Sequence, residues 1–314
     1  MTQQNILVIK LSALGDFILA LGSMEAIRKN HPDAHITLLT TALFADFAAR
    51  LRYFNHIVVD QRPAFYDLAG WLKLWKFFNG GNFSRVYDLQ LNDRTRVYYR
   101  LFSKKPEWSG VIAGSSLFYP NPAWRQMHAF DRHREVLKLA GIDLGLPQSL
   151  WMDADTAHFG LRLPFVLLVP GSAPQHPEKR WPVVKYIGLA QRLIREGYSV
   201  ALLGTKTESD ITGKIKRACP DVFDLTGQTS LFEIAALARK AAGAVGNDTG
   251  PMHLIALAGC PALTLFSAAS SPELSAPRGA EVAVIACDDL ALLSVDDVMK
   301  NLKLRKRDAD SKRA

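Results

Sequence analysis

The hydrophobic positions of this chain alternate between two kinds of run. Continuous apolar runs of four or five residues, such as 6–9 and 165–169, are typical of strands that are buried on both faces. Segments with apolar residues three and four apart, such as 183–196, are typical of amphipathic helices. In the first half, the predicted strands are 6–9, 35–39, 56–59, 85–89 and 108–112, and the predicted helices are 16–29, 42–51 and 66–78. In the second half, the predicted strands are 165–169, 199–203, 222–225, 241–245, 262–266 and 282–285, and the predicted helices are 183–196, 208–218, 231–240, 254–258 and 295–304.

This alternation of strands and helices predicts an α/β fold built from parallel sheets that are covered by helices. The rhythm breaks at 141–164, where Gly, Pro and scattered acidic residues gather. We therefore predict two Rossmann-like domains, 1–150 and 151–304, and a charged, disordered tail at 305–314. Two such domains predict a cleft between the carboxyl ends of their sheets, so functional residues are expected just after strands.

Charge and composition narrow the possible partners. Residues 1–150 hold 18 Lys and Arg against 12 Asp and Glu, whereas residues 151–314 hold 20 against 18. A basic first half suggests an acidic partner such as phosphate or anionic lipid, although an ordinary basic surface explains it equally well. Since no nucleic-acid recognition module is visible, we expect no nucleic-acid partner. With neither a signal peptide nor a long apolar run, a cytoplasmic location is expected.

Metal and nucleophile chemistry find little support. The three cysteines, Cys219, Cys260 and Cys287, are widely spaced and form neither a metal motif nor a disulfide framework, so ordinary reduced thiols are expected. No G-x-S-x-G elbow occurs. We therefore expect no metal site and no cofactor.

The richest polar segment is 246–253, with the sequence GNDTGPMH, between a strand-like and a helix-like run. A turn that opens a helix offers unpaired N–H groups and a partial positive charge, which is a ready anion site. Pro251 suits the first helical position, and Gly250 permits close approach of a ligand. The alternative is structural: Asp248 as an Asx-turn residue and His253 as an ordinary helix residue.

Three further loops follow predicted strands. In 171–182, Ser172, Lys179 and Arg180 suit a diphosphate, although a solvated loop anchored by Trp181 is an equal alternative. In 204–208, Glu208 either accepts hydrogen bonds from a ribose or caps the next helix.

The loop 10–16, with the sequence KLSALGD, carries neither a G-x-G-x-x-G pattern nor a P-loop. Asp16 is either a first-turn acid favoured by the helix dipole or a carboxylate that acts as a general base.

Taken together and in order, the segments IKLSALGD at 9–16, KRWP at 179–182 and GNDTGPMH at 246–253 resemble the ADP-heptose:lipopolysaccharide heptosyltransferases, glycosyltransferase family 9. The resemblance spans nearly the whole chain. It implies a GT-B fold, in which two Rossmann-like domains face each other across a cleft that closes around the substrates. It also implies an inverting, metal-independent transfer from an ADP-sugar.

The resemblance assigns roles residue by residue. Asp16 matches the catalytic base, and Lys179 matches the lysine that neutralises the donor diphosphate. The remaining matches bind the donor: Gly171 and Ser172 in a first phosphate loop, Asp248, Thr249 and Gly250 in the donor loop, His253 lining the same pocket, and Glu208 holding the ribose. After the predicted strand 262–266, the run SAASSPE departs from the family's usual Gly and Pro-Thr-Asp-like sequence, which puts the identity of the sugar in doubt.

The implied acceptor is a lipid-linked oligosaccharide of the lipopolysaccharide inner core, with peripheral contact at the cytoplasmic face of the inner membrane. The aromatic and basic run 71–78 suits a membrane interface, although the edge of a packed helix is the favoured interpretation. Arg94, Arg96 and Arg100 suit acceptor phosphates, or equally an exposed helix surface. Two other functions stay open: transfer of a different sugar or to a protein hydroxyl, and catalytically silent nucleotide binding.

Overall fold

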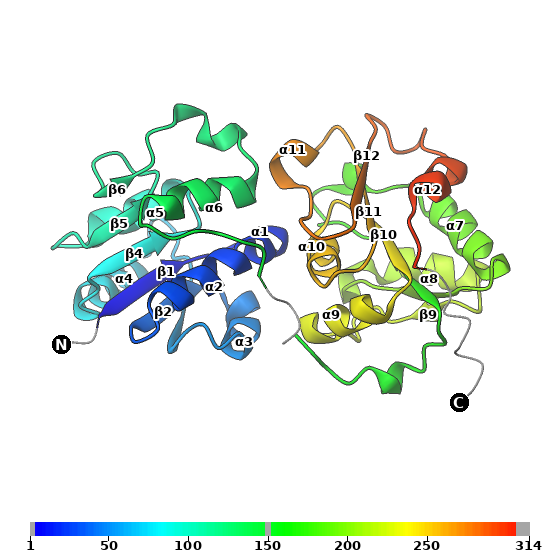
Figure 1. Cartoon of the computed structure of the whole chain (residues 1–314), viewed down its shortest axis with the longest axis horizontal. Coiled ribbons are helices and arrows are strands. Elements are labelled where there is room, and N and C mark those ends of the chain that lie inside the picture. Colours follow the sequence, from blue (N-terminus) through cyan, green and yellow to red (C-terminus); the bar gives the residue numbers. More distant parts are fainter. Residues whose placement is uncertain (1–3, 148–151, 306–314) are drawn as a thin grey trace. The chain divides into compact units, whose positions relative to one another are not determined.

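The computed structural model describes residues 4–147 and 152–305 and divides into two compact units, Met1–Pro147 and Gln148–Ala314 (Figure 1). In the first unit the strands are β1 Asn5–Ile9, β2 His35–Thr40, β3 His56–Val59, β4 Arg85–Asp88, β5 Glu107–Gly110 and β6 Leu117–Phe118. Its helices are α1 Leu14–Leu19, α2 Leu21–Asn30, α3 Ala42–Arg50, α4 Leu68–Gly80, α5 Asp93–Leu101, the 3-10 helix η1 Pro122–Gln126 and α6 Ala129–Lys138.

In the second unit the strands are β7 Phe165–Val169, β8 Ser199–Leu202, β9 Phe223–Asp224, β10 Gly243–Asn247, β11 Ala262–Phe266 and β12 Val282–Ala286. Its helices are α7 Val183–Arg195, α8 Ser209–Ala218, α9 Leu231–Lys240, α10 Gly250–Leu257, α11 Pro272–Ser275 and α12 Val295–Asn301, with short 3-10 helices η2 Ala157–Phe159, η3 Pro177–Lys179 and η4 Lys206–Glu208. The tail predicted at 305–314 lies, beyond Arg305, outside the described residues.

Both units contain a six-stranded sheet in which every strand pair is parallel. The order in the first sheet is β3-β2-β1-β4-β5-β6, and in the second it is β9-β8-β7-β10-β11-β12. Each unit therefore has the Rossmann strand order 3-2-1-4-5-6, with helices on both sides of the sheet in Figure 1. The predicted α/β class with two parallel sheets is confirmed.

The central strands are buried on both faces, as their uninterrupted apolar runs predict. Every residue of β7, β10 and β11 is buried. In the second unit, one face of the sheet packs against α7 through Tyr186, Leu189 and Leu193. In the first unit, Leu74 and Phe78 of α4 join Tyr98 and Trp108 in the core. These rigid cores fix the strand ends, and with them the loops that carry polar residues.

Three predictions about elements need correction. The single helix predicted at 16–29 is two helices, α1 and α2, which meet at Ala20. Helices α5 and α6 were not among the predicted elements. The segment 246–253 is mostly not a turn: Gly246 and Asn247 end β10, and α10 begins at Gly250 with Pro251 as its second residue.

Candidate active site

Each sheet has one switch point. It lies between the two neighbouring strands from which the connections run in opposite directions across the sheet. In a sheet of this kind ligands bind outside the carboxyl ends of the strands at that point. In the first unit the switch point lies between β1 and β4, and in the second between β7 and β10. The loops after these strands are 10–16 and 170–182, together with the short turns after β4 and β10, so most of the predicted site residues lie at the two switch points.

Asn247 joins the two switch-point loops of the second unit. Its side chain is fully buried at the end of β10. Its Oδ1 accepts hydrogen bonds from the Trp181 N–H and the Tyr186 hydroxyl, both at 3.0 Å. Its Nδ2 donates to the carbonyl oxygens of Pro170 at 2.8 Å and Gly171 at 3.1 Å. Asn247 thus fixes both ends of the 170–182 loop against β10, a positioning role that sequence reasoning missed.

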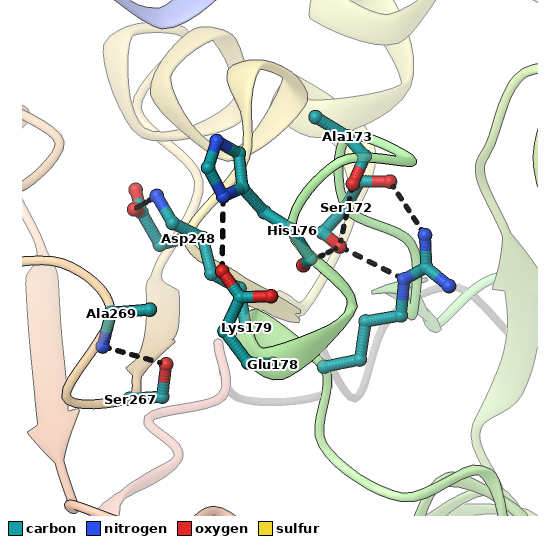
Figure 2. A network of polar contacts seen from close by, with 9 residues as sticks. Ser172, Ala173, His176, Glu178, Lys179, Asp248, Ser267 and Ala269 are labelled. Carbon is teal, nitrogen blue, oxygen red and sulfur yellow. Dashed lines mark hydrogen bonds and ion pairs between the residues drawn. The ribbon is translucent and has the colours of Figure 1, made fainter.

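Lys179 and Asp248 form an ion pair across this switch point (Figure 2). Lys179 Nζ lies 2.7 Å from Asp248 Oδ2, and the two side chains are 19% and 8% exposed. Asp248 stands between the end of β10 and Thr249, the N-cap of α10. The backbone N–H groups of Thr249 and Gly250 donate to no acceptor among the described residues. Lys179 is therefore tied to the residue that directly precedes two unpaired N–H groups at a helix N-terminus, a kind of helix end that suits anions.

Ser172 and Arg180 are engaged inside their own loop. The Ser172 hydroxyl donates to the His176 carbonyl oxygen at 2.7 Å and accepts from Arg180 Nε at 2.9 Å (Figure 2). Trp181 is buried, packs edge-to-face on Tyr186 and donates its indole N–H to the Leu293 carbonyl. The anchoring expected of Trp181 is therefore present, and the loop is built around it.

Glu208 caps a helix in this structure. Its Oε2 accepts from the N–H of Thr205 at 2.6 Å and from the Thr205 hydroxyl at 2.7 Å. Its other oxygen, Oε1, accepts no hydrogen bond among the described residues and lies over Gly171, where an added Cβ would be 2.2 Å away. Gly171 is thus required to leave room for this carboxylate, and Oε1 remains available to a ligand hydroxyl.

His253 lies one turn into α10 and is 4% exposed. Gly246, on the strand before it, packs against Val169 and Met252 so closely that an added Cβ would lie 2.6 Å from the Met252 sulfur. The helix therefore sits tightly against the sheet, which holds the N–H groups at its start in place.

Asp16 lies in the first turn of α1, at the switch point of the first unit. Its Oδ2 accepts a long hydrogen bond of 3.4 Å from the Ala13 N–H, and its Oδ1 accepts none among the described residues. Its carboxylate opposes the lowering of pKa that burial imposes on Lys10 and on Arg132 of α6. Asp16 therefore lies in the field of two cations, with one carboxylate oxygen that accepts no hydrogen bond among the described residues.

A buried polar cluster supports the Asp16 loop from below. Lys10 Nζ donates to the Leu89 carbonyl at 3.1 Å, and His133 Nε2 lies 2.9 Å from the same oxygen. Burial lowers the pKa of Lys10, lowers that of His133 to about 3 and raises that of Asp88 to about 6. These residues were absent from the predicted site. The signal available was a lysine ending an otherwise apolar strand run.

Gln90 fixes the loop itself, since its side-chain oxygen accepts from the N–H groups of Leu11 at 2.8 Å and Ser12 at 3.2 Å. The chain between β1 and α1 is thereby held to the turn that follows β4.

The arginines of α5 serve different purposes. Arg94 stacks near the rings of Trp71 and Tyr98 and donates to the Tyr98 hydroxyl, a packing role. Arg96 and Arg100 are exposed and line a pocket of about 530 Å³ together with Trp124.

A second pocket of about 650 Å³ lies at the β8–β9 edge of the other unit, away from its switch point.

The described residues hold no cluster of metal-ligating side chains and no membrane-spanning helix. Across 4–147 and 152–305, no three or more His, Cys, Asp or Glu side chains gather as metal ligands would. Over the same residues, no helix has both the length and the apolar character needed to cross a membrane.

Two Rossmann-ordered parallel sheets, each with polar loops at its switch point, are the arrangement of the GT-B fold class. The structure of the E. coli ADP-heptose lps heptosyltransferase II superposes with a TM-score of 0.74 at 22% identity, covering 95% of this chain and 97% of that one. The profile of glycosyltransferase family 9 (heptosyltransferase) matches residues 71–294. The chain belongs to this family, and the resemblance found in its motifs is confirmed.

Two curated relatives are also heptosyltransferases. Lipopolysaccharide heptosyltransferase 2 of Escherichia coli K12 is 33% identical over 308 residues, which cover 90% of this chain and 87% of the relative. Lipooligosaccharide heptosyltransferase 2 of Haemophilus influenzae is 32% identical over 148 residues, and this alignment spans 46% of this chain and 42% of that relative's length.

Proposed function

We propose that the protein transfers a heptose from ADP-heptose to a sugar hydroxyl of the lipopolysaccharide inner core, by an inverting reaction that needs no metal ion. The names of the relatives support the sugar and the pathway. The observation that carries the proposal is the Lys179–Asp248 pair beside the open N-terminus of α10.

The second unit would bind the donor diphosphate. Lys179 places one ammonium beside the unpaired N–H groups of Thr249 and Gly250, so cation and helix dipole act on the same phosphate oxygens. Such a set stabilises the negative charge that develops on a leaving diphosphate, which is the task a metal ion performs in other enzymes. In the proposed reaction, Lys179 and the start of α10 therefore take the place of a metal ion.

The first unit would supply the base. The free Oδ1 of Asp16 accepts the proton of the acceptor hydroxyl, while the oxygen of that hydroxyl forms a bond to C1 of the heptose. The bond from C1 to the diphosphate oxygen breaks at the same time, and ADP leaves carrying its electron pair. Attack from the face opposite the leaving group inverts C1.

Glu208 and His253 complete the proposed donor site. The unpaired Oε1 of Glu208 would accept a hydrogen bond from a ribose hydroxyl, while Oε2 continues to accept from the Thr205 N–H as the helix cap. His253 supports the helix start from within the unit. Ser172 contributes by shaping the 170–182 loop around Gly171.

A nucleotide panel tests the donor. ADP and ADP-heptose should raise the Tm of the protein, whereas UDP, GDP and their sugars should leave it unchanged. Stabilisation by UDP-sugars alone would overturn the donor assignment.

A substitution tests the base. Asp16→Asn should lower kcat by about 10²- to 10⁴-fold, the usual contribution of a general base, and leave the affinity for ADP within a few-fold. Asp33→Asn, at an exposed position, is the matched control and should keep full activity. Transfer at the normal rate by the Asp16 variant would remove the base assignment.

A further inference from the structure

One helix of the first unit shows apolar side chains on its outer face as well as its inner face. Helix α4 buries Leu74 and Phe78 in the core. Its outer face carries Leu68, Leu72 and Trp75, spaced four and three residues apart as neighbours on one helical face require. In Figure 1 this helix is drawn in cyan at the edge of the first unit.

The turn before α4 extends this apolar surface. Phe65 and Tyr66 are 95% and 86% exposed, and Leu68 at the start of the helix is 80% exposed. The turn is held rather than loose, because the Asp67 N–H and the Trp71 indole N–H both donate to the Ala64 carbonyl. Single exposed apolar residues are common, but five within eleven residues of one surface mark an interaction site.

The charges around this surface select its partner. Arg62, Lys73 and Lys76 are exposed beside the apolar residues, and on α4 the two lysines form a strip next to Leu72. The one acid in 62–80 is Asp67, whose carboxylate accepts the Gly70 N–H as the helix cap. Aromatic and leucine side chains flanked by lysines on a helix that lies flat are what an anionic bilayer surface binds.

We propose that this docking face, made of Phe65, Tyr66, Leu68, Leu72 and Trp75 with Arg62, Lys73 and Lys76, seats the protein on an anionic lipid bilayer. The apolar side chains enter the headgroup region, and the basic side chains contact lipid phosphates. The inference extends the proposed function, since it would hold the enzyme at the surface where a lipid-linked acceptor lies. Its test needs no acceptor, so it can succeed or fail independently of the transfer reaction.

The test is co-sedimentation of the full-length protein with vesicles of phosphatidylcholine alone or of phosphatidylcholine mixed with phosphatidylglycerol. Wild type should bind the mixed vesicles, and added salt should weaken the binding because it screens the lysines. Phe65→Ser/Leu72→Ser should lower the partition coefficient at least about tenfold through lost apolar burial. Lys73→Glu/Lys76→Glu should abolish the preference for phosphatidylglycerol.

Matched controls come from the same unit. Leu43→Ser removes a leucine of α3 that is 76% exposed, and Lys138→Glu reverses an exposed lysine of α6; both should bind vesicles as wild type does. If the serine variant has a lowered Tm, the lysine variant decides alone. Equal binding by wild type and both docking-face variants would overturn the proposal. So would a wild-type dimer that ignores vesicles and becomes monomeric in Phe65→Ser/Leu72→Ser, because the face would then belong to a second copy.

Discussion

The Lys179–Asp248 pair allows the structural and ligand-binding roles of one lysine to be separated. The perturbation is a cycle of three variants: Lys179→Met, Asp248→Asn and both together. Methionine keeps much of the lysine's apolar length, and asparagine keeps the shape of the aspartate, so each change removes mainly charge. Any loss of activity on removing Lys179 alone is ambiguous, because it also leaves Asp248 without its partner.

The structure sets the size of the effect. Removing one partner of a fully buried pair costs about 3–5 kcal/mol, whereas exposed pairs are worth about 0–1 kcal/mol. Asp248 is 8% exposed and Lys179 is 19% exposed, so the pair lies nearer the buried limit but is partly screened by water. We expect Lys179→Met to lower the unfolding free energy of the second unit by about 2–3 kcal/mol. The double variant should recover all but about 1 kcal/mol, because no charge is then left unpaired.

Affinity for ADP should follow a different pattern. A hydrogen bond to a charged group contributes about 1.5–3 kcal/mol, so losing the lysine should weaken ADP binding about 10- to 100-fold. That loss should persist in the double variant even though its stability returns. Local unfolding free energies from hydrogen exchange of 165–302, with ADP titrations by calorimetry, measure both quantities.

Two results would refute this reasoning. If Lys179→Met left the unfolding free energy unchanged, the ion pair would not have the strength its burial implies. If the double variant recovered ADP affinity along with stability, the only task of Lys179 would be to neutralise Asp248.

Three further predictions concern single residues. Burial, followed by the Lys10 charge, lowers the pKa of His133 from 6.5 to about 3. Between these two pH values His133 is protonated in the unfolded chain and neutral in the folded chain. The stabilising contribution of neutral His133 is complete above pH 6.5 and is lost as the pH falls toward 3. By linkage it amounts to about 5 kcal/mol. His133→Gln should flatten this pH dependence of stability, as measured by hydrogen exchange of α6. Asn247→Leu leaves the Trp181 backbone N–H and two carbonyl oxygens without partners, and leaves the Tyr186 hydroxyl only its long bond of 3.4 Å to the Val169 carbonyl. It should cost about 3 kcal/mol or more in urea unfolding, and Asn247→Asp should be no better because its oxygens would face those carbonyls. Gly171→Ala should displace the Glu208 carboxylate and remove its cap, lowering stability by about 1 kcal/mol, and adding Glu208→Ala should cost nothing further in Tm.

Strands were predictable because burial on both faces demands an unbroken apolar run. The predicted bounds 165–169 and 231–240 coincide with β7 and α9. Helix α6 escaped prediction because its buried face includes His133, which a pattern of apolar and polar residues counts as exposed. Helix α5 escaped for a related reason, since only Thr95 and Tyr98 of its residues are buried.

The candidate site was predictable in outline because parallel strands of a sheet end at the same edge. That rule places Asp16, Lys179 and Asp248 at switch points without any coordinates. It cannot show that Lys179 meets Asp248, 69 residues along the chain, or that Glu208 divides its two oxygens between a cap and open space. Their catalytic and binding roles stay predictions until the variants are measured.

In each unit a neutral amide side chain joins the two switch-point loops, beside charged side chains such as Lys10 and Arg180 that also bond to the backbone there. Gln90 follows the fourth strand of the first unit and grips the loop after β1, and Asn247 ends the fourth strand of the second unit and grips the loop after β7. An amide can accept and donate in a buried place without the cost of burying a charge, and it works unchanged across the pH range. Gln90 and Asn247 therefore hold the loops that carry Asp16 and Lys179 without adding a further charge beside them.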